Sequence, residues 1–117
     1  MAKKIITLTI FLFVTRVCFG QTQLEMNEKA YDDYLNADAL MTKMYRKAQK
    51  VLANSKQKKL LLDAQRAWLI FKESHCKTVA EAYDKGSMQP MVYSTCLQQI
   101  TKERTKQLKR IINDEVF

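Results

Sequence analysis

The residues best suited to chemistry in this sequence are one histidine and three cysteines. His75 lies directly before Cys76, and the other cysteines are Cys18 and Cys96. A metal site would need more ligands at suitable spacing, so we predict no metal centre. A cysteine–histidine nucleophilic pair would need a free thiol. We predict instead that His75 is a hydrogen-bonded packing residue on an apolar helix face.

Acid–base or phosphate chemistry is equally unsupported. Asp32 and Asp33 are adjacent, and adjacent residues on a helix point to different faces rather than toward one substrate. The sequence contains no glycine-rich phosphate loop. We therefore predict no catalytic residue, no cofactor and no enzymatic activity, and we expect a binding protein.

Three charged residues could form a buried polar network. Asp38 and Arg104 interrupt apolar stripes on two different predicted helices, and Arg66 lies on a third. A charge on such a stripe is costly unless it is paired. We predict that Asp38 pairs with Arg104 or Arg66 across the bundle. The alternative is that one or more of these side chains reaches solvent past the edge of its stripe.

Apolar residues recur at helical spacing along most of the chain after the first twenty residues, so the residues named above are expected to lie on helices. A first stripe runs from Leu24 to Leu52, and Asn54-Ser55 then provides a break and an N-cap. The second stripe, which is wider and predicts a central helix, comprises Leu61, Ala64, Trp68, Phe71, His75, Thr78 and Ala82, flanked by Leu62, Leu69, Cys76, Val79 and Tyr83.

A second break separates this helix from the last one. Gly86 suits the position that closes a helix, Pro90 suits the first turn of the next, and Ser87 is a candidate cap. The third stripe comprises Tyr93, Cys96, Leu97, Ile100, Arg104, Leu108 and Ile111. The sequence therefore predicts an all-α fold, a three-helix up-down-up antiparallel bundle.

The first twenty residues resemble a cleavable signal peptide. Lys3 and Lys4 precede an apolar run over residues 5–14, and Cys18-Phe19-Gly20 places small residues where signal peptidase cleaves. We predict a signal peptide over 1–20 and a mature domain over 21–117, located in the periplasm or secreted, with no transmembrane segment after cleavage. The alternatives are a retained anchor helix and, less favoured because Arg16 precedes Cys18, a lipoprotein signal.

Cleavage would leave two cysteines, Cys76 and Cys96. An even number in an oxidising compartment favours one disulfide over a metal site or a reactive thiol. Each cysteine lies about nine residues from the turn at Lys85-Gly86, so both would sit roughly 13–15 Å from it in an antiparallel hairpin. Two cysteines at the same level can form the bond.

The chain is basic, with a net charge of +8 that falls to +5 without Lys3, Lys4 and Arg16. Export argues against nucleic acid as the target. Charge runs on helices are usually solvated faces. An anionic component of the cell envelope, bound through the basic last helix, is the more plausible electrostatic partner and defines an alternative function as an envelope-associated interaction module.

Four blocks in order carry a family resemblance: TQLEMN from Thr22, NADALMTKMY from Asn36, LLDAQRAWLIFKESHC from Leu61 and GSMQPMVYSTCLQQITKERTKQL from Gly86. Together they resemble the LprI-like lysozyme-inhibitor family. The resemblance implies an exported helical domain, a disulfide equivalent to Cys76–Cys96, and a protein partner, host lysozyme.

Two departures from the family pattern matter. Relatives usually carry a second cysteine pair around the first block, whereas Lys29 stands at the corresponding cysteine position here. The first helix is therefore expected to be less tightly tied. In addition, this chain is basic, as the commonest lysozymes are, and like charges disfavour encounter.

An inhibitor needs an element that enters the glycosidase cleft. The best candidate is the turn Asp84 to Pro90, with Lys85, Gly86, Ser87 and Pro90 as its partner-binding residues. Lys85 or Ser87 could meet the paired carboxylates that glycosidases use. The alternative is that Gly86 and Pro90 only end one helix and begin the next.

Overall fold

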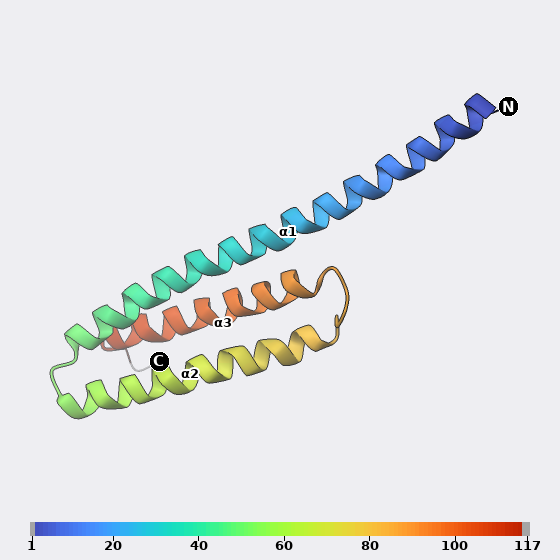
Figure 1. The fold of residues 1–117 in the computed structure, drawn as a ribbon. Coiled ribbons are helices and arrows are strands. Elements are labelled where there is room, and N and C mark those ends of the chain that lie inside the picture. Colours follow the sequence, from blue (N-terminus) through green and yellow to red (C-terminus); the bar gives the residue numbers. More distant parts are fainter. Residues whose placement is uncertain (1, 116–117) are drawn as a thin grey trace.

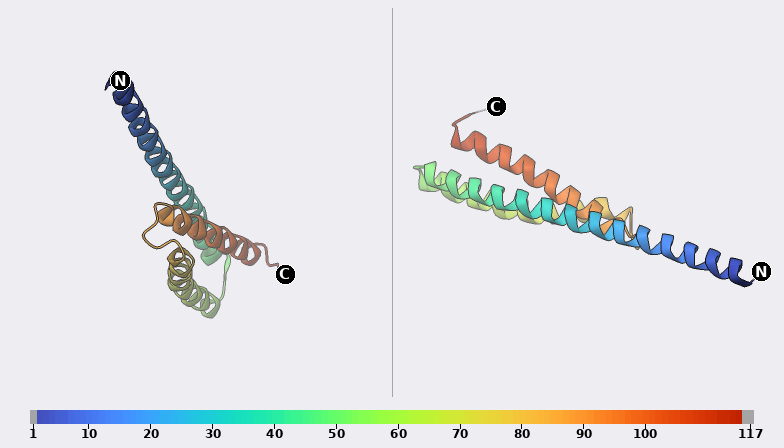
Figure 2. Two further views of the ribbon diagram at one scale, coloured as in Figure 1. Left: turned by 90° about the vertical axis from the view of Figure 1, so that its right-hand side faces the viewer. Right: turned by 90° about the horizontal axis from the view of Figure 1, so that it is seen from above.

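A computed structural model describes the backbone of residues 2–115 and the side chains of residues 22–115. Three helices account for the fold: α1 (Ala2–Val51), α2 (Ser55–Glu81) and α3 (Gln89–Ile112). Helices α1 and α3 run in one direction and α2 runs in the opposite one (Figures 1 and 2). The prediction of an all-α, up-down-up three-helix bundle is confirmed.

The predicted signal segment, residues 1–20, lies outside the residues whose side chains the structure describes, so the signal peptide stays a prediction. Within the described part of the chain, no helix combines the length and the apolar character that crossing a membrane requires.

Helix α2 begins at the predicted break. The side chain of Asn54 accepts a hydrogen bond of 2.8 Å from the backbone N–H of Lys56, and Asn54 itself is extended. This is the geometry of an N-cap, which satisfies one of the free N–H groups at the start of a helix. The capping prediction for Asn54-Ser55 is confirmed.

The turn between α2 and α3 differs from its prediction in two details. Gly86 does not take the left-handed conformation that a closing glycine would use; Lys85 does, at φ 60°. Gly86 instead relieves crowding, because a Cβ there would make a tight contact of 3.0 Å with the carbonyl oxygen of Tyr83. Ser87 is not the cap, since α3 is preceded by Met88 without a side-chain cap bond. Pro90 does lie in the first turn of α3, as predicted.

Helix α3, rather than α2, is the central helix. It packs along both α1 and α2, whereas α1 and α2 approach each other less closely. Several buried residues of α1 and α3 are small, which favours close packing, since the spacing of helices depends on the side chains between them. Ala37 and Ala48 of α1 are buried, as are Ser94 and Thr101 of α3.

The predicted stripe of α2 is rotated relative to the buried face. The buried residues of α2 are Leu61, Gln65, Lys72, Cys76 and Ala80. Phe71 and His75, which the prediction placed inside, are exposed, and their rings lie 5.4 Å apart at the surface. The prediction of His75 as a packing residue is therefore wrong. Polar Gln65 and Lys72 occupy the interior because they find partners there.

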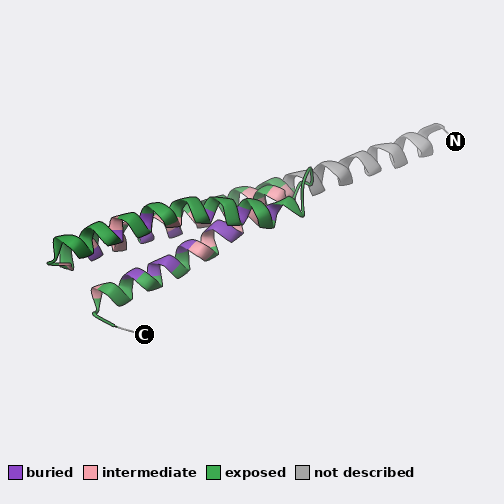
Figure 3. Ribbon diagram, turned by 90° about the horizontal axis from the view of Figure 1, so that it is seen from below, coloured by how far each residue is buried: buried purple, intermediate pink, exposed green. Residues whose placement is uncertain are grey.

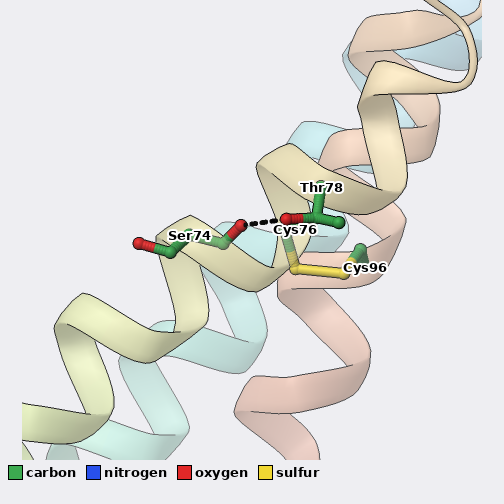
Figure 4. Close-up of a disulfide and its surroundings, with 4 residues drawn as sticks. All are labelled: Ser74, Cys76, Thr78 and Cys96. Carbon is green, nitrogen blue, oxygen red and sulfur yellow. Dashed lines mark hydrogen bonds between the residues drawn. A yellow bond between two sulfur atoms is a disulfide. The ribbon is translucent and has the colours of Figure 1, made fainter.

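Two apolar clusters form the core. One joins the three helices through Met41, Ala48, Leu61 and Leu108, and the other surrounds Cys76, Cys96 and Leu97. The predicted disulfide Cys76–Cys96 is confirmed, with a Cα–Cα distance of 5.6 Å (Figure 4). Closing a loop of this size stabilises a small domain by about 3 kcal/mol in the chain-entropy model. The bond fixes α2 to α3 about nine residues from the turn that connects them.

Candidate functional site

A buried lysine lies where α1 and α2 face each other. Lys72 Nζ donates a hydrogen bond of 3.0 Å to the hydroxyl of Tyr34 and lies 4.0 Å from the carboxylate of Asp38. The same ammonium lies 5.2 Å from the ring centre of Tyr34 and 4.9 Å from that of Trp68. Only 5% of the Lys72 side chain is exposed. One hydroxyl, two aromatic faces and a carboxylate thus compensate its burial.

The Asp38 prediction requires a correction. Among the described side chains, the only cation within 4.0 Å of the Asp38 carboxylate is Lys72, so the structure brings Asp38 together with neither Arg104 nor Arg66. Arg66 is exposed, as the solvent alternative expects. The correction follows from the α2 rotation, which directs Lys72 inward and Arg66 outward.

Arg104 is buried in a separate polar group. Its Nε donates to Gln65 Oε1 and its Nη1 donates to Gln107 Oε1, each at 2.9 Å. Gln65 in turn donates to the Met41 sulfur at 3.1 Å, which links all three helices. Burial lowers the pKa of Arg104, but a guanidinium stays charged in proteins. This group positions helices and offers no acid–base chemistry.

Residues 22–115 contain no candidate metal centre. No three histidine, cysteine, aspartate or glutamate side chains in that range gather closely enough to hold a metal ion. The groove between α2 and α3, about 520 Å³ and lined by Trp68, Phe71, Ile100 and Arg104, is shallow and open to solvent. This groove therefore does not enclose a small molecule on most of its surface.

The α2–α3 turn is exposed and internally hydrogen-bonded. Residues 81–88 are all exposed. Successive backbone bonds link Tyr83 to Ala80, Asp84 to Glu81, Gly86 to Tyr83 and Gln89 to Gly86, at 2.9–3.2 Å. Lys85 holds φ 60°, a conformation that is uncommon for residues other than glycine, asparagine and aspartate. Such backbone outliers tend to cluster at functional sites.

Helix α1 anchors this turn. The side-chain amide of Asn27 donates to the carbonyl oxygen of Ser87 at 3.1 Å, and Gln23 donates to Asn27 at 2.8 Å. On the other side, the Gln89 side chain donates to the Ala80 carbonyl oxygen at 3.3 Å. Asn27 belongs to the TQLEMN block and interrupts the first stripe. Its polarity there is explained by this bond to the turn.

Comparison with known proteins identifies the family of this chain. The sequence model of the family described as "Lysozyme inhibitor LprI" matches residues 19–108, most of the chain. The chain belongs to the lysozyme inhibitor LprI family. The match begins close to the predicted start of the mature domain and ends in the last turns of α3. The suspected resemblance is therefore confirmed at the level of the family.

A curated relative is similar to this chain but carries no assigned function. An uncharacterized protein of Rhizobium meliloti (strain 1021) is 30% identical over 103 residues, which cover 78% of this chain and 74% of the relative. No solved structure matches the chain. In place of the cysteine expected from the LprI family pattern, Lys29 forms a surface ion pair of 2.8 Å with Asp33.

Sequence reasoning missed Lys72 and Gln65, which organise the interior, and Asn27, which links α1 to the α2–α3 turn. A signal was present for the first two. Gln65, Lys72 and Cys76 continue from Leu61 at helical spacing, so a stripe that accepted polar members would have included them. The partner of Asn27, a backbone carbonyl 60 residues away, has no sequence signature.

Proposed function

We propose that this protein is an exported inhibitor of lysozyme that inserts its α2–α3 turn into the glycosidase cleft. Membership of the LprI family supports the activity. The turn is supported as the inserting element by one observation above all: Lys85 is exposed and held at φ 60° in a hydrogen-bonded segment. A preformed loop loses little entropy on binding.

The chemistry of the cleft fits this loop. Glycosidases use a pair of carboxylates that flank the bond they hydrolyse. A lysine that enters between them would form a charge-assisted contact and occupy the place of the sugar. The ammonium of Lys85 supplies this charge, and Ser87 supplies a hydroxyl beside it. Gly86 and Pro90 shape the turn, Gly86 by its lack of a Cβ and Pro90 by starting α3.

The distribution of charge removes part of the electrostatic objection. Although the chain is basic overall, acidic residues outnumber basic ones in the half of the bundle that contains the turn. The acidic residues there are Glu25, Glu28, Asp32, Asp33, Asp38, Glu73, Glu81 and Asp84, against Lys29, Lys72, Lys77 and Lys85. A cationic lysozyme would therefore be steered toward this end rather than toward the basic one.

The proposal is tested by measuring lysis of a bacterial cell-wall suspension by lysozymes of several types with increasing amounts of the oxidised protein. We expect dose-dependent inhibition of at least one type. Lys85→Glu should weaken inhibition by about tenfold or more, as expected for a charged residue at the centre of an interface. Lys85→Arg keeps the charge and should retain more activity.

Lys109→Glu is the matched control, because it makes the same charge change at an exposed position near the other end of the bundle. If Lys85→Glu and Lys109→Glu weaken inhibition equally, the turn is not the inserting element. If the protein inhibits no lysozyme at micromolar excess, the inhibitor proposal fails. Binding to an anionic envelope component through α3 would then stand as the remaining prediction for this chain.

A further inference from the structure

We infer that the outward face of α2 is a self-association surface, on which a second copy of this chain packs antiparallel about Ile70. Ile70 is 72% exposed, the most exposed of the large apolar residues in the described chain. It precedes buried Lys72 by two residues, which corresponds to about 200° around a helix. Ile70 therefore points away from the bundle, on the mostly exposed side of α2 that Figure 3 shows.

Four exposed charged residues share this face with Ile70. Asp63 and Lys77 lie seven residues before and after it, and Lys59 and Glu81 lie eleven residues before and after it. At 3.6 residues per turn, all four lie within about 20° of Ile70 around the helix. The face is thus a straight row with an apolar centre and charges at equal distances on both sides.

The charges in this row are complementary to themselves. A two-fold axis through Ile70 pairs each residue with the one equally far on the other side in the second copy, as in any isologous interface. Asp63 then faces Lys77 of the second copy, about 10 Å from the axis, and Lys59 faces Glu81, about 16 Å from it. Within each copy, Lys59 already pairs with Asp63 at 2.9 Å. In the dimer, these two residues and Lys77 and Glu81 of the second copy would form one cluster in which opposite charges alternate, and the cluster occurs twice.

The centre of the row suits close packing. On one side of Ile70, Ala67 and Ser74 are exposed and small, whereas the exposed Arg66 and Glu73 flank it on the other side. Small neighbours let two helices approach and let Ile70 of each copy contact the other. Phe71 is 56% exposed beside them and widens the apolar area. An apolar centre with a charged rim is the usual anatomy of a protein interface.

The dimer geometry predicts that two charge-reversed variants should associate with each other better than with themselves. Sedimentation equilibrium of the oxidised proteins over a range of concentrations tests this prediction. The unmodified protein should show a reversible monomer–dimer equilibrium. Lys59→Glu places two acidic pairs in the dimer, and Glu81→Lys places two basic pairs in it. Each variant alone should dimerise about tenfold more weakly or worse. Mixed together, they should form a heterodimer in which both contacts are again complementary.

The double variant Lys59→Glu with Glu81→Lys should likewise recover dimerisation, and Ile70→Asp should abolish it. Circular dichroism checks that each variant keeps its helix content. Lys109→Glu on α3 makes a matched charge change outside the row and should leave the equilibrium unchanged. Residues 1–20 are identical in all variants and cannot produce the recovery on mixing. A monomer at every concentration, or a mixture that associates no better than its two components, would overturn the inference.

Discussion

The side-chain amide of Asn27 lies 3.1 Å from the carbonyl oxygen of Ser87, across 60 residues of sequence. This contact ties α1 to the turn between α2 and α3, at the end of the molecule where the family pattern would lead one to expect a second disulfide. The Cys76–Cys96 bond joins only α2 and α3. Asn27 therefore supplies a link between the first helix and the proposed inserting element.

Asn27→Ala should loosen this turn without unfolding the bundle. We expect a loss of about 1 kcal/mol in global stability, the usual net worth of one hydrogen bond. Amide exchange of Gly86 and Gln89, whose N–H groups bond within the turn, should accelerate more than exchange in the middle of α3. Asn36→Ala, at an exposed position on α1, is the control. Unchanged exchange in the turn would show that Asn27 does not anchor it.

Lys72 should matter more through its packing than through its charge. Lys72→Ala leaves a cavity between Tyr34 and Trp68 and should cost about 2–3 kcal/mol. Lys72→Met keeps most of the volume and leaves the half-exposed Asp38 to water, so it should cost less, about 1 kcal/mol. Chemical denaturation measures both, with exposed Lys77→Ala expected to change stability by less than about 0.5 kcal/mol. Equal losses for the alanine and methionine variants would contradict this account.

Two buried threonines on α3 should respond oppositely to the same substitution. The Thr101 hydroxyl is buried without a hydrogen-bond partner, whereas Thr105 Oγ1 donates to the Thr101 carbonyl oxygen at 3.1 Å. Thr101→Val removes an unsatisfied polar group and should raise stability by up to about 1 kcal/mol. Thr105→Val removes a bond that is made and should lower stability by about 0.5–1 kcal/mol. Urea midpoints compare them, and a destabilised Thr101→Val would indicate that its hydroxyl has a partner.

Tyr93 should make stability fall at alkaline pH. Burial, and then the charge of Glu73, raises the pKa of Tyr93 above its ordinary value of 10.0. The folded state holds the Tyr93 proton more tightly than the unfolded state does. The resulting contribution to the free energy of unfolding is complete below the unfolded-state pKa and is lost as pH rises through the folded-state pKa. The free energy of unfolding of Tyr93→Phe, compared with that of the unmodified protein at the same pH, should therefore increase as pH rises from neutral to above about 10. A constant difference would refute the role of Tyr93.

The helices and the disulfide were predictable from sequence because their determinants are local. Asn54 marks the start of α2, Pro90 marks the start of α3, and the two cysteines lie equally far from the turn between them. The interior polar groups were not predictable in the same way. Burial of Lys72 depends on Tyr34 and Asp38, which lie 38 and 34 residues away in the chain, and a charge pattern alone cannot reveal such partners.

The rotation of α2 has the same origin. Counting only apolar residues placed Phe71 and His75 inside, because Gln65 and Lys72 looked like solvent positions. The observed helix buries the two polar residues, since each meets hydrogen-bond acceptors across the bundle, and leaves Phe71 and Ile70 on the surface. The position of the turn between α2 and α3, in contrast, was predicted correctly, although the left-handed residue is Lys85 and not Gly86. Its role as a partner-binding loop stays a prediction.

The central claim is that the α2–α3 turn occupies the cleft of a lysozyme. The most direct test is a binding titration of the oxidised protein with a lysozyme that it inhibits, in the presence and absence of a saturating cell-wall oligosaccharide. If the turn fills the cleft, the oligosaccharide competes with this protein for lysozyme. The apparent Kd of this protein for lysozyme should then rise by a factor of one plus the oligosaccharide concentration divided by the Kd of the oligosaccharide. An affinity that does not change when the cleft is filled with sugar would contradict the claim.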